Sequence, residues 1–211
     1  MINLLSEKNL QAGIRIWHQT TWPPDFHNQF YKDLHRRREH GLDEEWWLAT
    51  VDDLCKWKAI RPLPKGEVLA RGQKRLQDLR REYARMQSIP GNQMANLSNL
   101  SWEDVADLYQ VAYEIKNVNA PVFGSKLCHF IMPDAFPVID GRIIKKIRKV
   151  IGVNNPSYKD YWQFCKAQWV GCTAQSQLVA MMQKEIEKIG RNVFIHYPYA
   201  TKITELCISG S

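Results

Sequence analysis

The spacing of apolar residues constrains the fold more than any other feature of this chain. Between residues 65 and 87, one apolar or small residue recurs every three or four positions, and the series is Leu69, Gly72, Leu76, Leu79, Tyr83 and Met86. Side chains three and four positions apart share one face of an α-helix, so the series predicts an amphipathic helix. Similar patterns predict helices over residues 25–40, 43–60, 157–169 and 174–190.

Some helix ends can also be identified in the sequence. Ser101 is followed three positions later by Asp104, a capping-box pattern that predicts a helix continuing to about Lys116. Pro90-Gly91 should end the helix that begins near residue 65. The segment VFIHY, at residues 193–197, is the only candidate strand and is too short to form a sheet. The fold class that follows is all-α.

Length and composition bound the number of domains. A chain of 211 residues, of which 45% are hydrophobic, can form one helical domain with its own core. Prolines at positions 62, 64 and 90 could also mark a hinge, which would divide the chain into helical lobes 1–64 and 65–211 on either side of a cleft. We therefore expect a single globular helical domain, with two lobes as the alternative.

The sequence also disfavours several locations and one kind of site. No apolar run reaches the roughly 18 residues of a membrane span, and the first residues lack the pattern of a signal peptide. The five cysteines are an odd number without dense spacing, which favours reduced thiols in a cytoplasmic protein. The segment HRRREH, at residues 35–40, has neither zinc-protease spacing, so we expect no metal site and read its arginines as phosphate contacts or a solvated helix end.

Positive charge is concentrated in two segments. The formal net charge is +7, from 29 Lys and Arg against 22 Asp and Glu. Residues 65–86 contain seven basic and three acidic residues, and residues 141–151 contain five basic residues and no acid. Concentrated positive charge is typical of nucleic-acid-binding proteins, and its alternative explanation is a solvated helix face. The candidate nucleic-acid ligands in these segments are Arg71, Arg75, Arg142, Lys145, Lys146 and Lys149.

One acidic residue stands where an apolar segment meets the second basic segment. In FPVIDGRIIKKIRK, at residues 136–149, Asp140 precedes a helical pattern in which Ile143 and Ile147 share a face. An aspartate here can cap the helix, because its carboxylate accepts hydrogen bonds from the free amides of the first turn. Capping explains the residue type, but the sequence around Asp140 indicates a second role.

The segment PVFGSKLCHFIMPDAFPVIDGRI, at residues 121–143, resembles the core of the helix-hairpin-helix DNA glycosylases, the superfamily that includes 8-oxoguanine DNA glycosylase and endonuclease III. Phe123-Gly124-Ser125-Lys126 is similar to the Val-Gly-x-Lys of that family's hairpin. Pro137-Val138-Ile139-Asp140 is similar to its proline loop and essential aspartate. Asp140-Gly141-Arg142-Ile143 is similar to the family's Asp-x-His/Arg-Val/Ile. The resemblance covers only this segment of the chain.

The resemblance implies a DNA-binding enzyme that cleaves the N-glycosidic bond of an extruded damaged base. Asp140 would be the catalytic carboxylate, because positive charge develops on the sugar as the bond breaks. Lys126 would be the attacking amine of a glycosylase that also has lyase activity. The backbone around Gly124 and Ser125 would bind a phosphate.

Some members of the superfamily carry an iron–sulfur cluster on four cysteines. Cys165 and Cys172 have the spacing of the first two ligands, but Gln175 stands where the third would follow. We therefore expect no cofactor. Near the C-terminus, the aromatic residues around Pro198, with Lys202 close by, could stack on bases, but such residues more often fasten a terminal segment to a helical body.

Two other functions stay open at this point. The first is a non-catalytic nucleic-acid-binding module, which is favoured by the short separation of Lys126 and Asp140 compared with the family. The second is a protein-interaction domain whose basic face binds an acidic protein partner.

Overall fold

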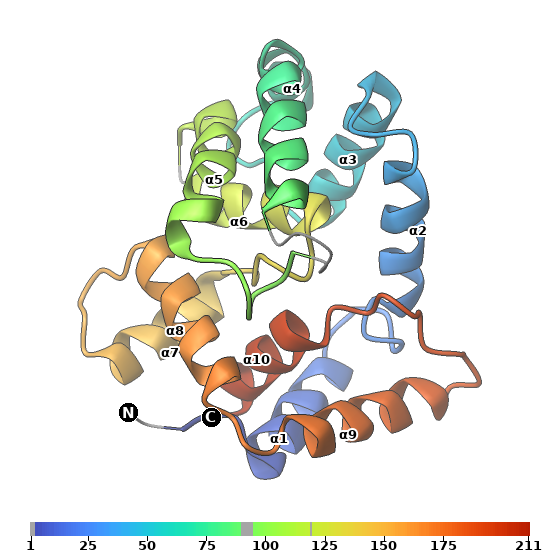
Figure 1. Ribbon diagram of the computed structural model, residues 1–211, viewed down its shortest axis with the longest axis vertical. Helices are drawn as coiled ribbons and strands as arrows, with labels where there is room; N and C mark the ends of the chain where they lie inside the picture. The colour runs from blue at the N-terminus through green and yellow to red at the C-terminus, as the bar shows by residue number, and fades with distance from the viewer. Residues whose placement is uncertain (1–2, 90–94, 119) are drawn as a thin grey trace. The chain divides into compact units, whose positions relative to one another are not determined.

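The structure is a computed structural model of the chain and describes residues 3–89, 95–118 and 120–211. These residues contain ten α-helices and no strand, which confirms the all-α prediction (Figure 1). The chain divides into two compact units. Unit 1 combines residues Met1–Asp33 with Ile139–Ser211, and unit 2 is Leu34–Val138. This division differs from the expected lobes 1–64 and 65–211.

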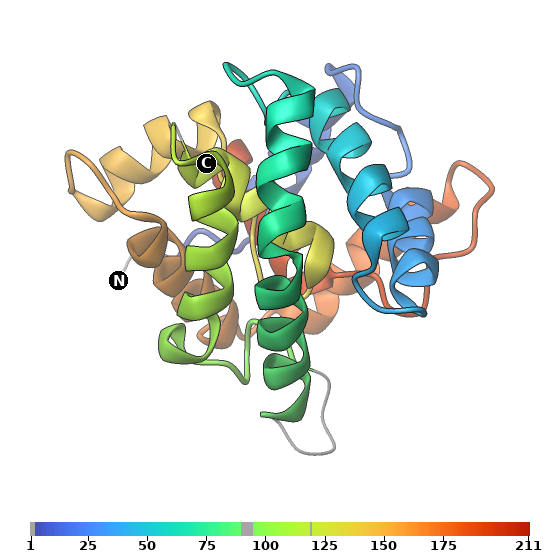
Figure 2. The ribbon, with the colours of Figure 1, turned by 90° about the horizontal axis from the view of Figure 1, so that it is seen from above.

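Unit 2 is built around four helices that follow one another along the chain. They are α3 (Glu44–Lys56), α4 (Lys65–Ser88), α5 (Trp102–Lys116) and α6 (Ala120–Ile131). The unit begins inside α2 (Asn28–Arg38). Helix α4 packs between α3 and α5, as Figure 2 shows, and α6 packs against α5 and α3. The start of α5 has the predicted capping box, in which Ser101 and Asp104 each bind the other's backbone amide.

The packing of α3 against α4 explains why residue 64 is not a boundary. Trp47 of α3 lies so close to Gly72 of α4 that a Cβ added to Gly72 would be 1.8 Å from Cζ2 of the indole. The indole Nε1 also donates to the carbonyl oxygen of Leu69 at 3.0 Å. The helices on either side of Pro62 and Pro64 therefore share one core. Pro90 and Gly91, the expected end of α4, lie outside the described residues.

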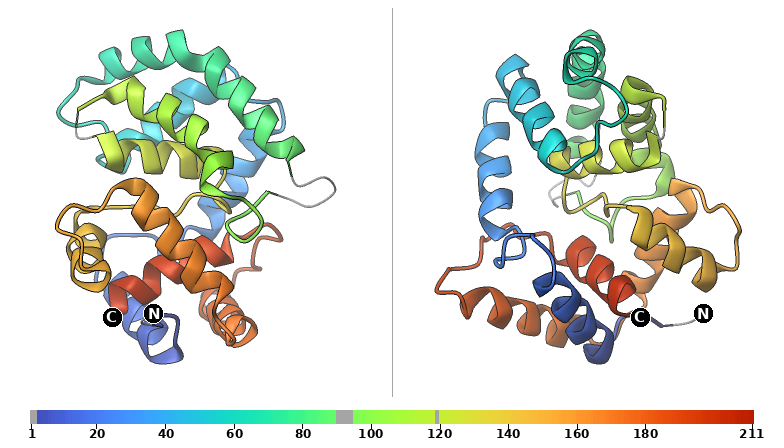
Figure 3. Two further views of the ribbon diagram at one scale, coloured as in Figure 1. Left: turned by 60° about the vertical axis from the view of Figure 1, so that its left-hand side comes forward. Right: turned by 180° about the vertical axis from the view of Figure 1, so that it is seen from behind.

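Unit 1 contains α1 (Glu7–His18), α7 (Gly141–Ile151), α8 (Tyr158–Val170), α9 (Gln175–Glu187) and α10 (Tyr199–Gly210). Helix α10 packs against each of the other four, and α1 and α10 lie side by side (Figure 3). Their close approach depends on glycines. A Cβ on Gly13 would lie 2.0 Å from the carbonyl oxygen of Leu206, and one on Gly210 would lie 2.0 Å from that of Asn9.

Two local predictions in unit 1 are wrong. Helix α2 begins at Asn28 rather than near residue 25, because Phe26 and His27 have positive φ angles of 52° and 66°. Residues 193–197 have no regular structure apart from a turn at 195–196, so they do not form a strand. Tyr197 attaches this segment to the loop that precedes α2, since its hydroxyl donates to the carbonyl oxygen of Phe26 at 3.0 Å.

Among the described residues, none of the helices has both the length and the apolar character needed to cross a lipid bilayer.

Candidate nucleic-acid interface

Helix α7 has one apolar face and one strongly basic face. Ile143 and Ile147 are buried, and the helix packs against α10 within unit 1. Its five basic residues lie among positions 142–149, and every one except Lys146 is exposed. The apolar spacing therefore fixes which side of the helix is buried and leaves the cations toward solvent.

Asp140 is the N-cap of α7, as one of its two expected roles requires. Its Oδ1 accepts hydrogen bonds from the backbone amides of Arg142 and Ile143, both at 2.9 Å. The side chain is half-buried. Its Oδ2 has no hydrogen-bond donor within the part of the chain that the structure describes. One oxygen is thus held by the helix, and the other is available to a ligand.

The basic side chains of α7 have no acidic partners among the described residues. Arg142, Lys145 and Lys149 make neither an ion pair nor a side-chain hydrogen bond there, and Arg148 contacts only the amide oxygen of Asn155 at 3.3 Å. Lys146 differs, because its Nζ donates to the carbonyl oxygens of Ser209 and Ser211, both at 2.5 Å. Burial, followed by the charge of Lys149, lowers the pKa of Lys146.

The basic residues of α4 have a different environment. Arg71 pairs with Glu67 at 2.5 Å, and Arg75 pairs with Asp78 at 3.0 Å and with Glu114 at 2.6 Å. Further pairs join Lys65 to Asp52, Arg81 to Asp78 and Glu82, and Arg85 to Glu82. Intramolecular acids therefore neutralise much of the positive charge of this helix, which charge counting along the sequence does not reveal. The roles of Arg71 and Arg75 remain predictions.

The segment compared with a hairpin lies inside helix α6. Residues Phe123, Gly124, Ser125 and Lys126 are all buried there. A Cβ on Gly124 would be 3.0 Å from the ring of Tyr109 in α5, so the glycine permits close helix packing. Backbone amides in the middle of a helix bond to carbonyls one turn earlier and are not presented to a phosphate. The structure therefore corrects the expected hairpin at Gly124 and Ser125.

The ammonium group of Lys126 is held by Trp57, which lies in the same unit. Its Nζ donates to the carbonyl oxygen of Trp57 at 2.8 Å and lies 5.8 Å from the centroid of the Trp57 indole. Lys126 belongs to unit 2 and Asp140 to unit 1. These contacts give the buried ammonium a structural role.

Three other features of the sequence have structural roles. His129 is buried, with Nδ1 2.7 Å from the carbonyl oxygen of Phe136, as expected for a core histidine. Arg37 pairs with Asp53 at 2.6 Å. Lys202 is buried, with Nζ 4.0 Å from the centroid of Trp17, and burial lowers its pKa to about 8. A buried lysine cannot assist base stacking at the surface. No group of three metal-binding side chains was found in the described residues.

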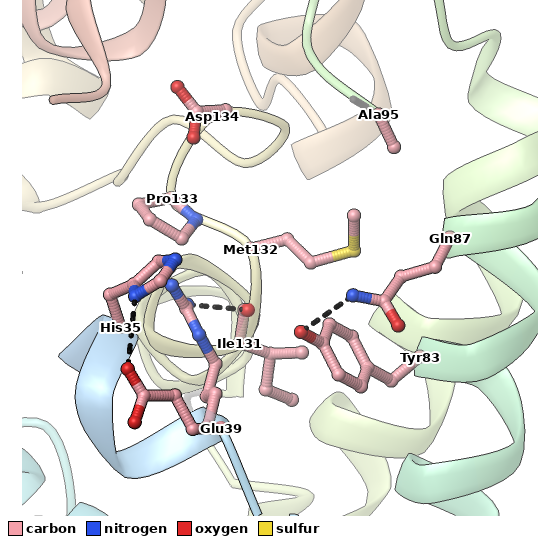
Figure 4. A pocket seen from close by; sticks show the side chains of 10 residues that line it. His35, Glu39, Tyr83, Gln87, Ala95, Ile131, Met132, Pro133 and Asp134 are labelled. Carbon is pink, nitrogen blue, oxygen red and sulfur yellow. Dashed lines mark hydrogen bonds and ion pairs between the residues drawn. The ribbon is translucent and has the colours of Figure 1, made fainter. Parts of the chain in front are cut away.

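Sequence reasoning missed a cavity within unit 2. Arg38, Tyr83 and Asp134 contribute to its wall, and burial raises the pKa of Asp134 to about 6 (Figure 4). Arg38 belongs to the basic run at residues 35–40, and Asp134 lies in the segment that resembles a glycosylase. Nothing in the sequence signals that these residues meet in space.

Comparisons of this chain with protein-family models, with curated proteins and with solved structures found no match.

Proposed function

We propose that this protein binds DNA through α7 and releases a damaged base with Asp140 as the catalytic carboxylate. The observation that carries the proposal is the combination found at α7. Four exposed cations without acidic partners in the described structure directly follow a carboxylate that has one oxygen available. Cations of this kind can replace the counterions of DNA phosphates, and the freed counterions favour binding.

The carboxylate would act on charge that develops during the reaction. Cleavage of an N-glycosidic bond builds positive charge on the sugar, and a fixed carboxylate stabilises that charge more than it stabilises the ground state. The two amides of α7 that hold Oδ1 of Asp140 would fix its orientation without using Oδ2. Asp140 would therefore cap α7 through Oδ1 and act on the sugar through Oδ2.

The proposal assigns no lyase step to Lys126. Its Nζ donates to the carbonyl oxygen of Trp57, which supports a structural role for the amine. We therefore expect base release without strand cleavage. Abasic product would be cut only after treatment with alkali, and borohydride would trap no covalent complex with the protein.

The binding half of the proposal is tested with matched charge variants. Fluorescence anisotropy with a labelled duplex, from 50 to 200 mM salt, gives the dependence of affinity on salt. The variant K145Q/R148Q/K149Q should lower the log–log slope by about 0.9 for each phosphate contact that is lost. The control K65Q/R81Q/R85Q removes the same charge from residues with acidic partners and should retain the wild-type slope. Equal weakening by both variants, or no binding at 50 mM salt, would contradict the proposal.

The catalytic half is tested with Asp140→Asn. Asparagine is as good an N-cap as aspartate, so this variant should keep α7 and its affinity for DNA. Base release from duplexes carrying oxidised, alkylated or deaminated bases should fall by at least about a hundredfold, as for the loss of other electrostatic catalysts. If the wild-type protein binds DNA but releases no base from any of them, it is a non-catalytic nucleic-acid-binding module.

A further inference from the structure

Unit 2 contains a cavity of about 330 Å³ that has no part in the proposed DNA contacts. Its wall combines the C-terminal end of α2, the C-terminal part of α4, and the end of α6 with the residues that follow it. Cavities that bind small molecules commonly have volumes of about 300–1,000 Å³. This cavity therefore has room for a small organic molecule.

The half-buried guanidinium of Arg38, whose pKa is lowered by desolvation, supplies hydrogen-bond donors to this cavity. Arg38 Nη1 donates to the carbonyl oxygens of Phe130 at 2.9 Å and Ile131 at 2.6 Å, which accounts for both of its hydrogens. The Nε and Nη2 atoms carry three further donors, and neither atom has a hydrogen-bond partner among the described residues. Enclosing charged donors without acceptors is costly, so an acceptor bound in the cavity would offset that cost.

The cavity also has a second kind of donor and an apolar surface. The Tyr83 hydroxyl accepts a hydrogen bond from Gln87 Nε2 at 2.9 Å, and within the described structure no acceptor takes its own hydrogen. Met132 and Ile131 line the same space, and Figure 4 shows the ring of Tyr83 facing them. A matching ligand has an acceptor group at one end and a hydrocarbon part at the other.

The charges on the wall limit the acceptor to a single negative charge. The titratable groups are Arg38, Tyr83, Asp134 and the pair formed by His35 and Glu39, which are 3.9 Å apart. Burial raises the pKa of Asp134 to about 6, and the positive charge of Arg38 opposes that rise. A doubly charged anion would exceed the single positive charge of Arg38 even when Asp134 is protonated. A monoanion would be balanced by Arg38 when Asp134 is protonated.

We propose that this cavity binds a small organic acid through its carboxylate. Arg38 donates from Nε and Nη2 to the two carboxylate oxygens, since a guanidinium and a carboxylate form bidentate pairs. The Tyr83 hydroxyl donates a third hydrogen bond, and protonated Asp134 donates a fourth. The hydrocarbon part of the ligand lies against Ile131 and Met132.

The test uses benzoate as the probe, with benzyl alcohol as its neutral analogue and inorganic sulfate, which carries two charges throughout this pH range, as a second anion. Calorimetric titration of the full chain should show saturable binding of benzoate, and weaker binding of the other two. Benzoate affinity should fall by about tenfold or more between pH 5.5 and 7.5, because Asp134 loses its proton over that range. No nucleic acid is involved, so the result is independent of the proposed DNA binding.

Matched variants identify the groups involved. Arg38→Met should lower benzoate affinity by at least about tenfold. Its control is Arg36→Met, which removes the same charge from an exposed residue outside the cavity wall and should leave benzoate affinity unchanged. Tyr83→Phe should lower the affinity by about threefold to tenfold. Asp134→Asn should remove most of the pH dependence.

The two conservative variants keep the test decisive if Arg38→Met fails to fold, because Tyr83→Phe and Asp134→Asn leave the Arg38 bonds to α6 intact. Three results would each overturn the proposal. They are equal affinities for benzoate and benzyl alcohol, equal affinities of Arg38→Met and Arg36→Met for benzoate, and an absence of saturable benzoate binding in the wild-type protein.

Discussion

Single residues in this protein differ sharply in how their charges are compensated. Arg75 of α4 has two acidic partners, whereas Lys145 and Lys149 of α7 have none among the described residues. One carboxylate oxygen of Asp140 caps α7, and the other has no hydrogen-bond donor among the described residues. The carboxylate of Asp134 accepts from its own backbone amide and lies near the positive charge of Arg38, but desolvation by burial outweighs both and raises its pKa to about 6. Local partners, rather than residue type, decide which groups can act on a ligand.

The environment of Asp134 predicts how stability depends on pH. Its folded pKa of about 6 exceeds the ordinary value of 3.8, so between about pH 4 and 6 the folded state holds a proton that the unfolded chain has released. Stability should therefore be lost as the pH rises through this window, by on the order of 3 kcal/mol from this residue. Asp134→Asn should lack this loss, as measured by urea unfolding at a series of pH values.

A matched control for the pH experiment is Asp107→Asn, because Asp107 has a side chain that is 73% exposed. This variant should lose stability with rising pH as the wild-type protein does. Parallel curves for Asp134→Asn and the wild-type protein would show that the carboxyl of Asp134 is not desolvated in the folded protein.

Helix pairs in both units depend on contacts that leave no room for a side chain. In unit 2, Gly72 admits the indole of Trp47 between α3 and α4. In unit 1, Gly13 allows the backbone of α1 to approach that of α10. The obstacle at Gly13 is a carbonyl group, which cannot rotate away as the end of a long side chain can. Packing at Gly13 is therefore sensitive to a single methyl group.

Gly13→Ala tests the packing of these two helices. The added Cβ would lie 2.0 Å from the carbonyl oxygen of Leu206, so α1 and α10 would have to separate. We expect a loss of about 1–3 kcal/mol in the free energy of unfolding, despite the better helix propensity of alanine. Gly66→Ala, where no atom lies within 4 Å of the added Cβ, should instead gain up to about 1 kcal/mol. Urea unfolding measures both, and equal stabilities would contradict the close approach.

The molecule as a whole keeps most of its thiols inside its two units. Cys128, Cys165, Cys172 and Cys207 are buried, Cys55 is half-buried, and all five are free. Burial is the main reason that the pKa of each of the buried residues Cys128, Cys165 and Cys207 is raised, which makes these three thiols poor nucleophiles while the protein is folded. Cys55 is only half-buried, so a reagent can reach its thiol without unfolding. Thiol reactivity can therefore report on unfolding of either unit.

We expect one thiol, that of Cys55, to react with Ellman's reagent in the folded protein. The other four should react only when their unit opens, and all five should react in guanidinium chloride. In Cys55→Ser, the rapid phase of the reaction with Ellman's reagent should be absent, and the four buried thiols should still react slowly. Rapid reaction of two or more thiols in the folded protein would contradict the burial described here.

The sequence by itself determined the helices and several of their ends. Apolar spacing identified α4, and the pair Ser101 and Asp104 identified the start of α5, because periodicity and capping depend on residues within a few positions of each other. The same local rule placed Asp140 at the start of α7. The boundary proposed at residue 64 failed, since it ignored the contact of Trp47 with Gly72.

Only the tertiary structure decided which charges are neutralised and which side chains share a cavity. Arg75 and Glu114, or Arg38 and Asp134, are far apart in the chain, and no local pattern records that folding brings them together. The expected hairpin at Gly124 became part of α6 for the same reason, because packing against Tyr109 of α5 outweighs the turn preference of a glycine. Secondary structure follows from short-range spacing, whereas burial, ion pairing and pKa follow from contacts that only the folded chain creates.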